Sequence, residues 1–300
     1  MKLTTVRTPN GTAAARVDGQ HGVLIDGAAD VGALLAIPGW RALAESAAGA
    51  RVPLDDLHTL IPHPGKIVCV GLNYGEHVAE GGGRSAPDRP LLFSKFANAV
   101  VADGEAIVRP EGCRALDLEV ELGVVIGGRA RRVPVEEAMD HVAGYVVVND
   151  VSARDWQGIP AVLHEGEKGD GQWLRAKGSD TFLPMGPVFV TKDELDPAAG
   201  VRLRSWRIPA GSDEPELMQD GTTADLIHSV PKLIAFISRH ITLEPGDVIA
   251  TGTPAGVGVF RDPPVLLEPG DRVRCEIDGI GSVETPSSTG RTTPGRRLTV

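Results

Sequence analysis

Residues 116–128 read LDLEVELGVVIGG, and this stretch constrains the fold more than any other part of the chain. In its first half, apolar residues alternate with the acids Asp117, Glu119 and Glu121. Successive side chains of a strand point to opposite faces, so this pattern places the three acids on one face. The second half continues as an apolar strand. The row of carboxylates therefore indicates either a solvated strand face or a site that holds a cation.

The composition narrows the fold and the class of partner. The 300 residues are 42% hydrophobic, which is enough for a packed core in two domains or in one large domain with an appendage. Aromatic residues make up only 4%, whereas 37 glycines and 23 prolines favour many short strands joined by turns. The net charge of -10, without an evident basic cluster, argues against a nucleic-acid partner.

The cysteines and the N-terminus indicate a compartment. Cys69, Cys113 and Cys275 are far apart, and no Cys/His spacing is typical of zinc ligands, so we expect neither a disulfide framework nor a structural zinc site. The N-terminus has no apolar signal core, and no apolar run approaches the length that spans a membrane. We predict a soluble cytoplasmic protein that does not associate with membranes.

The pattern along the chain predicts three parts. Residues 1–62 form a small β-rich N-terminal domain with a hairpin around Asp18 and Gly19 and a helical piece over 31–49. Residues 63–283 form the main domain, and the polar residues 284–300 form a weakly ordered tail. In the main domain we expect strands over 66–71, 90–95, 119–127, 144–150, 188–191, 201–206, 246–251 and 271–278, and helices over 134–144 and 223–240, where Pro231 starts or kinks the second helix.

A further carboxylate bears on the row of acids. The run GYVVVND, residues 144–150, is continuously apolar, which is typical of a strand buried on both faces, and it ends at Asp150. If the two strands are neighbours, Glu119, Glu121 and Asp150 converge. Three carboxylates without Cys or His ligands suit a hard divalent cation, namely Mg²⁺, Mn²⁺ or Ca²⁺. The metal site depends on that adjacency.

Three other segments carry groups that catalysis could use, and each also has a purely structural interpretation. In GLNYGEHVAEGGG, His77 and Glu80 are three residues apart, so the carboxylate could orient a general base, or His77 could be an ordinary surface residue. Lys177 could stabilise a developing oxyanion or be solvated. The turn ATGTPAGVG could offer backbone N–H groups and the Thr253 hydroxyl to a carboxylate, or simply be a tight turn.

The order of these segments resembles that of one family. The succession GLNYGEHVAE, PLLFSK, DLEVELGVVIG, GYVVVNDVSARDWQ, QWLRAKGSDTFLPMGP, MQDGTTADLI and LEPGDVIATGTPAGVG is similar to the fumarylacetoacetate hydrolase superfamily, from about residue 66 to 281. The resemblance implies an α+β, β-rich fold, a mixed β-sandwich roll of the fumarylacetoacetate hydrolase C-terminal type. It also implies a divalent metal, usually Mg²⁺ and sometimes Mn²⁺ or Ca²⁺, a small 2-oxo acid substrate and a homodimer.

The family pattern also implies roles for individual residues. It assigns Glu119, Glu121 and Asp150 to the metal and leaves Asp117 outside the ligand set. It assigns water activation to His77 and Glu80, and charge stabilisation to Lys177. It implies that the substrate is contacted by Tyr74, Arg154, Gln157 and Thr253. Two segments, 158–170 and 207–221, are longer than in many compact members, and we expect both to border the site.

The resemblance implies an activity with alternatives. We expect a metal-dependent hydrolase that cleaves a C–C bond of an acylpyruvate, such as fumarylpyruvate or acetylpyruvate, in the catabolism of aromatic compounds or sugar acids. The same site could instead serve an oxaloacetate-type decarboxylase or a 2-hydroxydienoate isomerase or hydratase. A metal-binding scaffold with an idle site is the alternative outside the enzymes.

Overall fold

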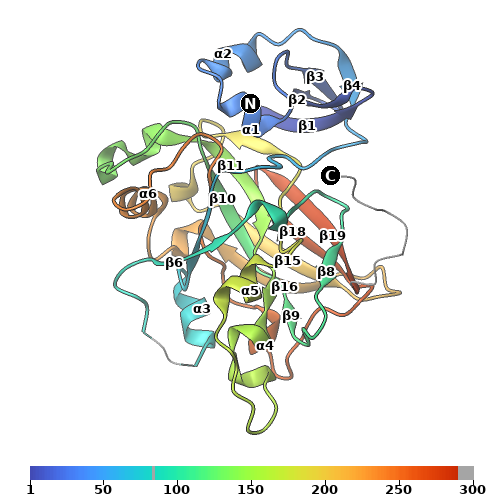
Figure 1. The fold of residues 1–300 in the computed structure, drawn as a ribbon, viewed down its shortest axis with the longest axis vertical. Coiled ribbons are helices and arrows are strands. Elements are labelled where there is room, and N and C mark those ends of the chain that lie inside the picture. Colours follow the sequence, from blue (N-terminus) through green and yellow to red (C-terminus); the bar gives the residue numbers. More distant parts are fainter. Residues whose placement is uncertain (83–84, 290–300) are drawn as a thin grey trace.

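The computed structural model describes residues 1–82 and 85–289, and its largest element is a mixed sheet of ten strands (Figure 1). Only one neighbouring pair in this sheet, β17 with β5, is parallel. From one edge to the other the strands are β4 (Arg51–Pro53), β3 (His21–Leu24), β2 (Gly11–Asp18), β1 (Lys2–Thr8), β14 (Phe189–Thr191), β11 (Val142–Asn149), β10 (Val120–Ile126), β17 (Val248–Ala250), β5 (Ile67–Gly71) and β6 (Leu91–Lys95).

A second sheet packs against the middle of the first. Its five strands are β16 (Glu216–Thr222), β15 (Arg202–Ile208), β18 (Arg272–Ile277), β19 (Gly281–Thr289) and β8 (Ile107–Arg109). β10 and β11 contact β15, β18 and β19, so the two sheets enclose the core between them. Two further pairs are short: β9 (Leu116–Asp117) with β12 (Ser152–Ala153), and β7 (Val100–Val101) with β13 (Leu183–Pro184).

The helices are short and lie around the sheets (Figure 1). The α-helices are α1 (Val31–Leu35), α2 (Trp40–Glu45), α3 (Gly75–Glu80), α4 (Arg154–Gln157), α5 (Trp173–Gly178) and α6 (Val230–Ser238). The 3₁₀ helices are η1 (Ala97–Ala99), η2 (Val135–His141), η3 (Pro160–Val162), η4 (Pro197–Ala199), η5 (Thr223–Asp225) and η6 (Gly258–Phe260). Within the described residues, no helix is long and apolar enough to cross a bilayer.

The strands that bear the site lie at the centre of the molecule. Every residue of β10 and β11 is buried, because each strand has a neighbour on both sides and the second sheet covers one face. This confirms the prediction of a strand buried on both faces: residues 144–150 are all buried, although β11 ends at Asn149. Glu121 of β10 and Glu119 directly before it therefore do not lie on a solvated edge, and they need partners inside the protein.

The β-rich fold class is confirmed, and the differences from prediction lie at element boundaries. The helix predicted over 134–144 is a 3₁₀ helix that ends at His141, because residues from Val142 onward join β11. The helix predicted over 223–240 covers only Val230–Ser238. Pro231 lies in its first turn, as predicted for a helix start, where the missing proline N–H costs no helical hydrogen bond.

Both ends of the described part of the chain join the main sheets more closely than predicted. Strands β1 to β4 do not form a sheet of their own, because β1 pairs with β14 and so extends the ten-stranded sheet. Residues 284–289 were predicted to belong to the tail, but they continue β19, which pairs with β18 and β8. The rest of the predicted tail, residues 290–300, lies outside the described residues.

Candidate active site

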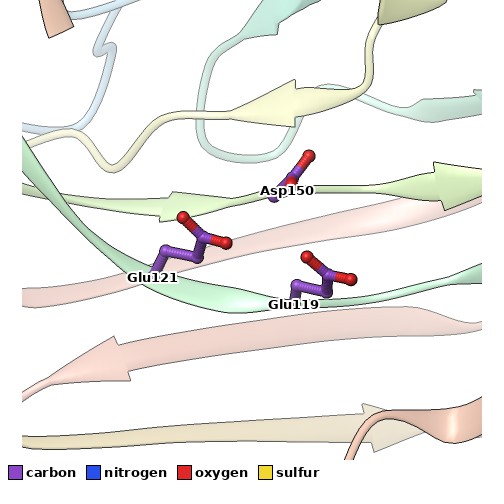
Figure 2. A group of neighbouring side chains, drawn as sticks. All are labelled: Glu119, Glu121 and Asp150. Carbon is purple, nitrogen blue, oxygen red and sulfur yellow. The ribbon is translucent and has the colours of Figure 1, made fainter. Parts of the chain in front are cut away.

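Three carboxylates meet where β10 and β11 run side by side (Figure 2). In this antiparallel pair Val120 faces Asn149, so Glu119 and Asp150 lie just beyond the paired residues. One carboxylate oxygen each from Glu119, Glu121 and Asp150 lies within 4.8 Å of the other two. All three side chains are buried. The two predicted strands are therefore neighbours, as the metal site requires.

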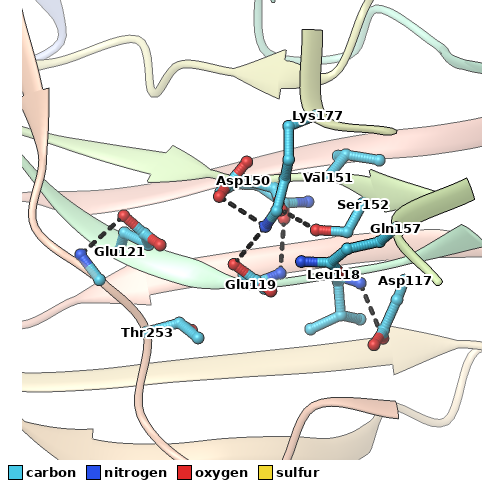
Figure 3. Close-up of polar contacts among 12 residues, drawn as sticks. Asp117, Leu118, Glu119, Glu121, Asp150, Val151, Ser152, Gln157, Lys177 and Thr253 are labelled. Carbon is cyan, nitrogen blue, oxygen red and sulfur yellow. Dashed lines mark hydrogen bonds and ion pairs between the residues drawn. The ribbon is translucent and has the colours of Figure 1, made fainter. Parts of the chain in front are cut away.

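Two lysines hold this cluster. Lys177 on α5 donates to Glu119 Oε2 at 2.8 Å and to Asp150 Oδ2 at 2.7 Å (Figure 3). Lys95, at the end of β6, lies 2.7 Å from Asp150 Oδ1 and also donates to the carbonyls of Val151 and Phe182. Sequence reasoning missed Lys95. Its signal was a lysine at the end of an apolar strand, a position that a charged residue occupies only when it has a partner inside.

The pKa values of the acids diverge because their neighbours differ. Burial raises the pKa of Glu119, but the positive charges of Lys177 and Arg154 outweigh it and hold that pKa well below its usual range. Burial also raises the pKa of Glu121, and the charges of Asp150 and Glu119 raise it further. A nearby cation would offset this repulsion and lower the pKa of Glu121.

Asp117 has a different environment, because the strand predicted through these acids is interrupted. Residues 116–117 form β9 and pair with β12, whereas β10 begins at Val120. The Asp117 carboxylate accepts from the backbone N–H of Gly258 at 2.9 Å and of Val259 at 3.1 Å, and from Arg154 Nε at 2.9 Å. Asp117 thus ties Arg154 to η6, and it lies outside the three-carboxylate cluster.

The donor set fits a hard divalent cation. Such ions bind carboxylate oxygens, and three of these are gathered here without a Cys or His in the group. Within residues 1–82 and 85–289, buried polar atoms without a hydrogen-bond partner also surround the cluster. These atoms are Asn149 Nδ2, Arg154 Nη2 and Asp150 Oδ1, whose contact with Lys95 is an ion pair without hydrogen-bond geometry. Such atoms normally have a partner. Asp150 Oδ1 could ligate a cation, whereas the N–H groups of Asn149 and Arg154 need an acceptor, such as a water or a substrate oxygen.

His77 and Glu80 form the predicted pair on α3. His77 Nδ1 lies 2.7 Å from Glu80 Oε1, and Glu80 Oε2 accepts from the backbone N–H of Gly256 at 2.8 Å. The carboxylate is fixed from both sides and sets the orientation of the imidazole. His77 lines the pocket described below, so the structure places it with the carboxylates and not on an open surface. Of the glycines after this helix, Gly83 lies outside the described residues.

Backbone N–H groups of the turn after β17 bind the carboxylates of Glu121 and Glu80, which belong to the protein and not to a substrate. Gly252 donates its N–H to Glu121 Oε2 at 2.9 Å, as Gly256 does to Glu80. Gly252 has a φ of +100°, and a Cβ there would lie 2.8 Å from Asn73 Cβ, so both conformation and space require glycine. The Thr253 hydroxyl donates to the Val120 carbonyl at 2.9 Å. Its proton is therefore committed and is not free for a substrate.

Of the other residues predicted to contact substrate, Arg154 and Gln157 line the pocket and Tyr74 does not. Arg154 lines the pocket, and its Nη1 lies 2.7 Å from Glu119 Oε1 and donates to Gln157 at 3.0 Å. Among the described residues its Nη2 has no hydrogen-bond partner, so it can take a substrate carboxylate. Gln157 and Thr253 also line the pocket. Tyr74 does not line the pocket: it directly precedes α3 as its N-cap and is buried, with 1% of its surface exposed.

These groups open into one pocket of about 760 Å³, a volume that includes solvent at the mouth. Ile159 and Pro160 of the long segment 158–170 line it, as predicted, whereas no residue of 207–221 does. Leu72, another wall residue, has a φ of 56°. That conformation costs a residue with a side chain about 1–3 kcal/mol, and such residues cluster at active sites and ligand-binding sites.

The fold and site define a class of protein, and the comparisons identify it. Residues 66–286 match the profile described as fumarylacetoacetate (FAA) hydrolase C-terminal. The chain therefore belongs to the fumarylacetoacetate hydrolase family, an enzyme family, and the resemblance of its motifs is confirmed.

The names of the proteins that this chain resembles describe different activities. The chain is 44% identical over 228 residues to the mitochondrial oxaloacetate tautomerase of Xenopus laevis, a match covering 75% of this chain and 66% of that protein. It is similar in structure to a 5-carboxymethyl-2-hydroxymuconate delta-isomerase from Mycobacterium smegmatis, with a TM-score of 0.75, 33% identity, and coverage of 97% and 100%. A maleylpyruvate hydrolase from Sphingobium also matches, with a TM-score of 0.75, 30% identity, and the same coverage.

Proposed function

We propose that this chain is a divalent-metal-dependent enzyme that interconverts the keto and enol forms of an oxaloacetate-type 2-oxo acid. The observation that carries the proposal is the meeting of three buried carboxylates with the His77–Glu80 pair at one pocket. The similarity to an oxaloacetate tautomerase supports tautomerisation over the acylpyruvate hydrolysis that the motifs first suggested. An isomerase among the structural neighbours supports the same chemistry.

The reaction needs one proton to move from carbon to oxygen. A divalent cation held by Glu119, Glu121 and Asp150 would draw electron density from the 2-oxo oxygen and so acidify the C3–H bond. Arg154 Nη2 would bind the substrate carboxylate. With Nδ1 held by Glu80, His77 would take the C3 proton at Nε2. The C3–H electron pair becomes the C2–C3 double bond, and the 2-oxo oxygen gains a proton.

Hydrolysis of an acylpyruvate is the second candidate. It uses the same pocket and adds a water, which His77 would activate instead of taking the C3 proton. The firm anchoring of Glu80 by Gly256 and the similarity to a maleylpyruvate hydrolase favour it. The two reactions differ in products, because tautomerisation releases no fragment and hydrolysis releases pyruvate.

One experiment decides between them. The protein is given oxaloacetate, acetylpyruvate or fumarylpyruvate with Mg²⁺ or with chelator, and the enol absorbance and released pyruvate are followed. We expect metal-dependent interconversion of keto and enol oxaloacetate. Replacing His77 with Ala should lower kcat by roughly 10²–10⁴-fold while the protein still binds Mg²⁺. Pyruvate release from an acylpyruvate without tautomerisation would select the hydrolase, and no metal-dependent reaction of any 2-oxo acid would refute both.

The oligomeric state and the physiological metal ion are proposals that follow from the family pattern. We propose a homodimer, which light scattering would show as twice the 31.5 kDa chain mass. We propose Mg²⁺ as the physiological ion, with Mn²⁺ or Ca²⁺ as substitutes. A cytoplasmic location stays a prediction, and the frog relative is described as mitochondrial.

A further inference from the structure

The His77 imidazole is held by a polar contact at one of its two nitrogens. Its Nδ1 lies 2.7 Å from Glu80 Oε1, and among the described residues the ring has no second polar partner. One contact at Nδ1 leaves the ring able to swing about its side-chain torsions. A general base must nevertheless keep its other nitrogen within hydrogen-bond reach of the proton that it takes. Packing has to supply the remaining constraint.

Phe260 of η6 packs against this imidazole. The two ring centroids are 6.2 Å apart and the ring planes are inclined by 51°, a favourable arrangement for two aromatic rings. A Cβ at Gly81 would lie 3.6 Å from Phe260 Cζ, so the end of the phenyl ring also lies against the residue that caps α3. Phe260 thus contacts both the His77 ring and the end of the helix that carries it.

Helix α3 is weak by itself. It has six residues, and its N-cap, Tyr74, makes no side-chain capping hydrogen bond. It ends at Gly81, and Gly82 follows with a φ of +89°. A helix this short is not stable in isolation. The position of His77 therefore depends on contacts between α3 and the rest of the protein.

The segment that carries Phe260 is held firmly by comparison. Two backbone N–H groups of η6 donate to the buried carboxylate of Asp117. The Gly258 carbonyl accepts from the Val265 N–H at 2.9 Å. Arg261, the next residue after η6, donates to the Met218 carbonyl at 2.7 Å. A well-anchored segment thus packs against a weak helix, which is the arrangement needed to fix a group on that helix.

We propose that Phe260 is a positioning residue for His77, which it keeps turned toward the pocket without taking part in the proton transfer. The inference rests on the proposed function, in which His77 is the base. The segment 256–260 then fixes both members of the pair, because Gly256 holds Glu80 through its N–H and Phe260 packs on His77. Loss of the phenyl ring leaves the carboxylate cluster and Arg154 in place, so it slows the chemical step more than it weakens substrate binding.

The test measures kcat and KM for the Mg²⁺-dependent keto–enol interconversion of oxaloacetate. We expect Phe260→Ala to lower kcat by about tenfold or more and to change KM by less than about twofold. Phe260→Leu, which refills most of the space with an apolar side chain, should keep kcat within about threefold of the wild type. Phe236→Ala is the matched control and should change neither value. Phe236 is also half-buried and meets His240 at 6.3 Å between ring centroids, but it does not line this pocket.

The outcomes separate the inference from the function beneath it. An unchanged kcat in Phe260→Ala would overturn the inference. A raised KM with unchanged kcat would also overturn it, because Phe260 would then contact the substrate. Equal losses of kcat in Phe260→Ala and Phe260→Leu would do the same. His77→Ala is measured in the same assay, and an unchanged kcat there would overturn the proposed role of His77 as well.

A further variant covers the case in which Phe260→Ala does not fold, as judged by circular dichroism. Phe260→Val removes less of the side chain, and it should lower kcat by more than Phe260→Leu does. A wild-type kcat in Phe260→Val would then overturn the inference.

Discussion

At the scale of single residues, the site depends on ion pairs that orient the groups facing the substrate. Asp117 contacts no part of the metal cluster, yet it holds Arg154 through Nε and fixes two N–H groups of η6. Gly258 can approach Asp117 this closely only because it has no Cβ, since a Cβ there would lie 2.7 Å from Asp117 Oδ1. A charge-assisted bond between buried partners of this kind is stronger than a neutral one.

Replacing Asp117 with Asn tests this positioning. The variant keeps the size of the side chain but removes its charge, so Arg154 is held less firmly and the substrate carboxylate is bound less well. We expect KM for the 2-oxo acid to rise about tenfold, equivalent to about 1.4 kcal/mol, with a smaller change in kcat. Glu76→Gln, on the exposed side of α3, is the control. An unchanged KM in Asp117→Asn would show that Asp117 does not position Arg154.

At the scale of elements, the turn after β17 joins the two halves of the site. It holds Glu121 through Gly252 and Glu80 through Gly256. Gly256 has a φ of +102°, and a Cβ there would lie 2.3 Å from the Met218 carbonyl oxygen. Gly211 has a similar φ of +77°, but nothing lies within 4 Å of its Cβ position. Substituting each of the two glycines therefore separates the energetic cost of the backbone conformation from the cost of steric crowding.

Replacing each of these glycines with Ala measures that difference. Gly211→Ala should lower the free energy of unfolding by about 1–2 kcal/mol, the usual cost of the left-handed conformation. Gly256→Ala should lower it by more and should also reduce kcat, because the turn must shift away from Glu80. Urea unfolding and steady-state kinetics give both values. Equal destabilisation by the two variants would contradict the crowding seen at Gly256.

The elements also show what the sequence could predict. Strands such as 144–150 are recognisable because continuous apolar runs need burial on both faces, and the ligand set followed once their adjacency was assumed. The break between β9 and β10 could not be foreseen, because the alternation runs unbroken through Leu118 and its cause is the pairing of Asp117 with distant segments. Lys95 was missed for the same reason, since its partner Asp150 lies on another element.

At the scale of the whole molecule, the packed core isolates the three thiols. Cys69, Cys113 and Cys275 are free and buried. Burial raises the pKa of Cys113 to about 12, and it raises those of Cys69 and Cys275 as well. Because a raised pKa leaves little thiolate at pH 8, and the thiolate is the reactive form, each thiol should be inert in the folded protein.

Titration with a disulfide reagent such as Ellman's reagent checks this prediction. At about pH 8, near the usual thiol pKa, the native protein should show no fast-reacting thiol. In guanidinium chloride, the same sample should give the absorbance expected for three reactive thiols. A thiol that reacts at once in the native state would mean that the core opens more readily than this packing allows.

The proposed activity requires that Glu119, Glu121 and Asp150 form a site for a divalent cation. Isothermal calorimetry with Mg²⁺, repeated with Mn²⁺, measures this directly on the wild-type protein, on Glu121→Gln, and on Glu76→Gln as a control acid on the exposed side of α3. We predict one ion per chain for the wild type and for Glu76→Gln, and loss of binding in Glu121→Gln. Equal binding by all three proteins would contradict the assignment.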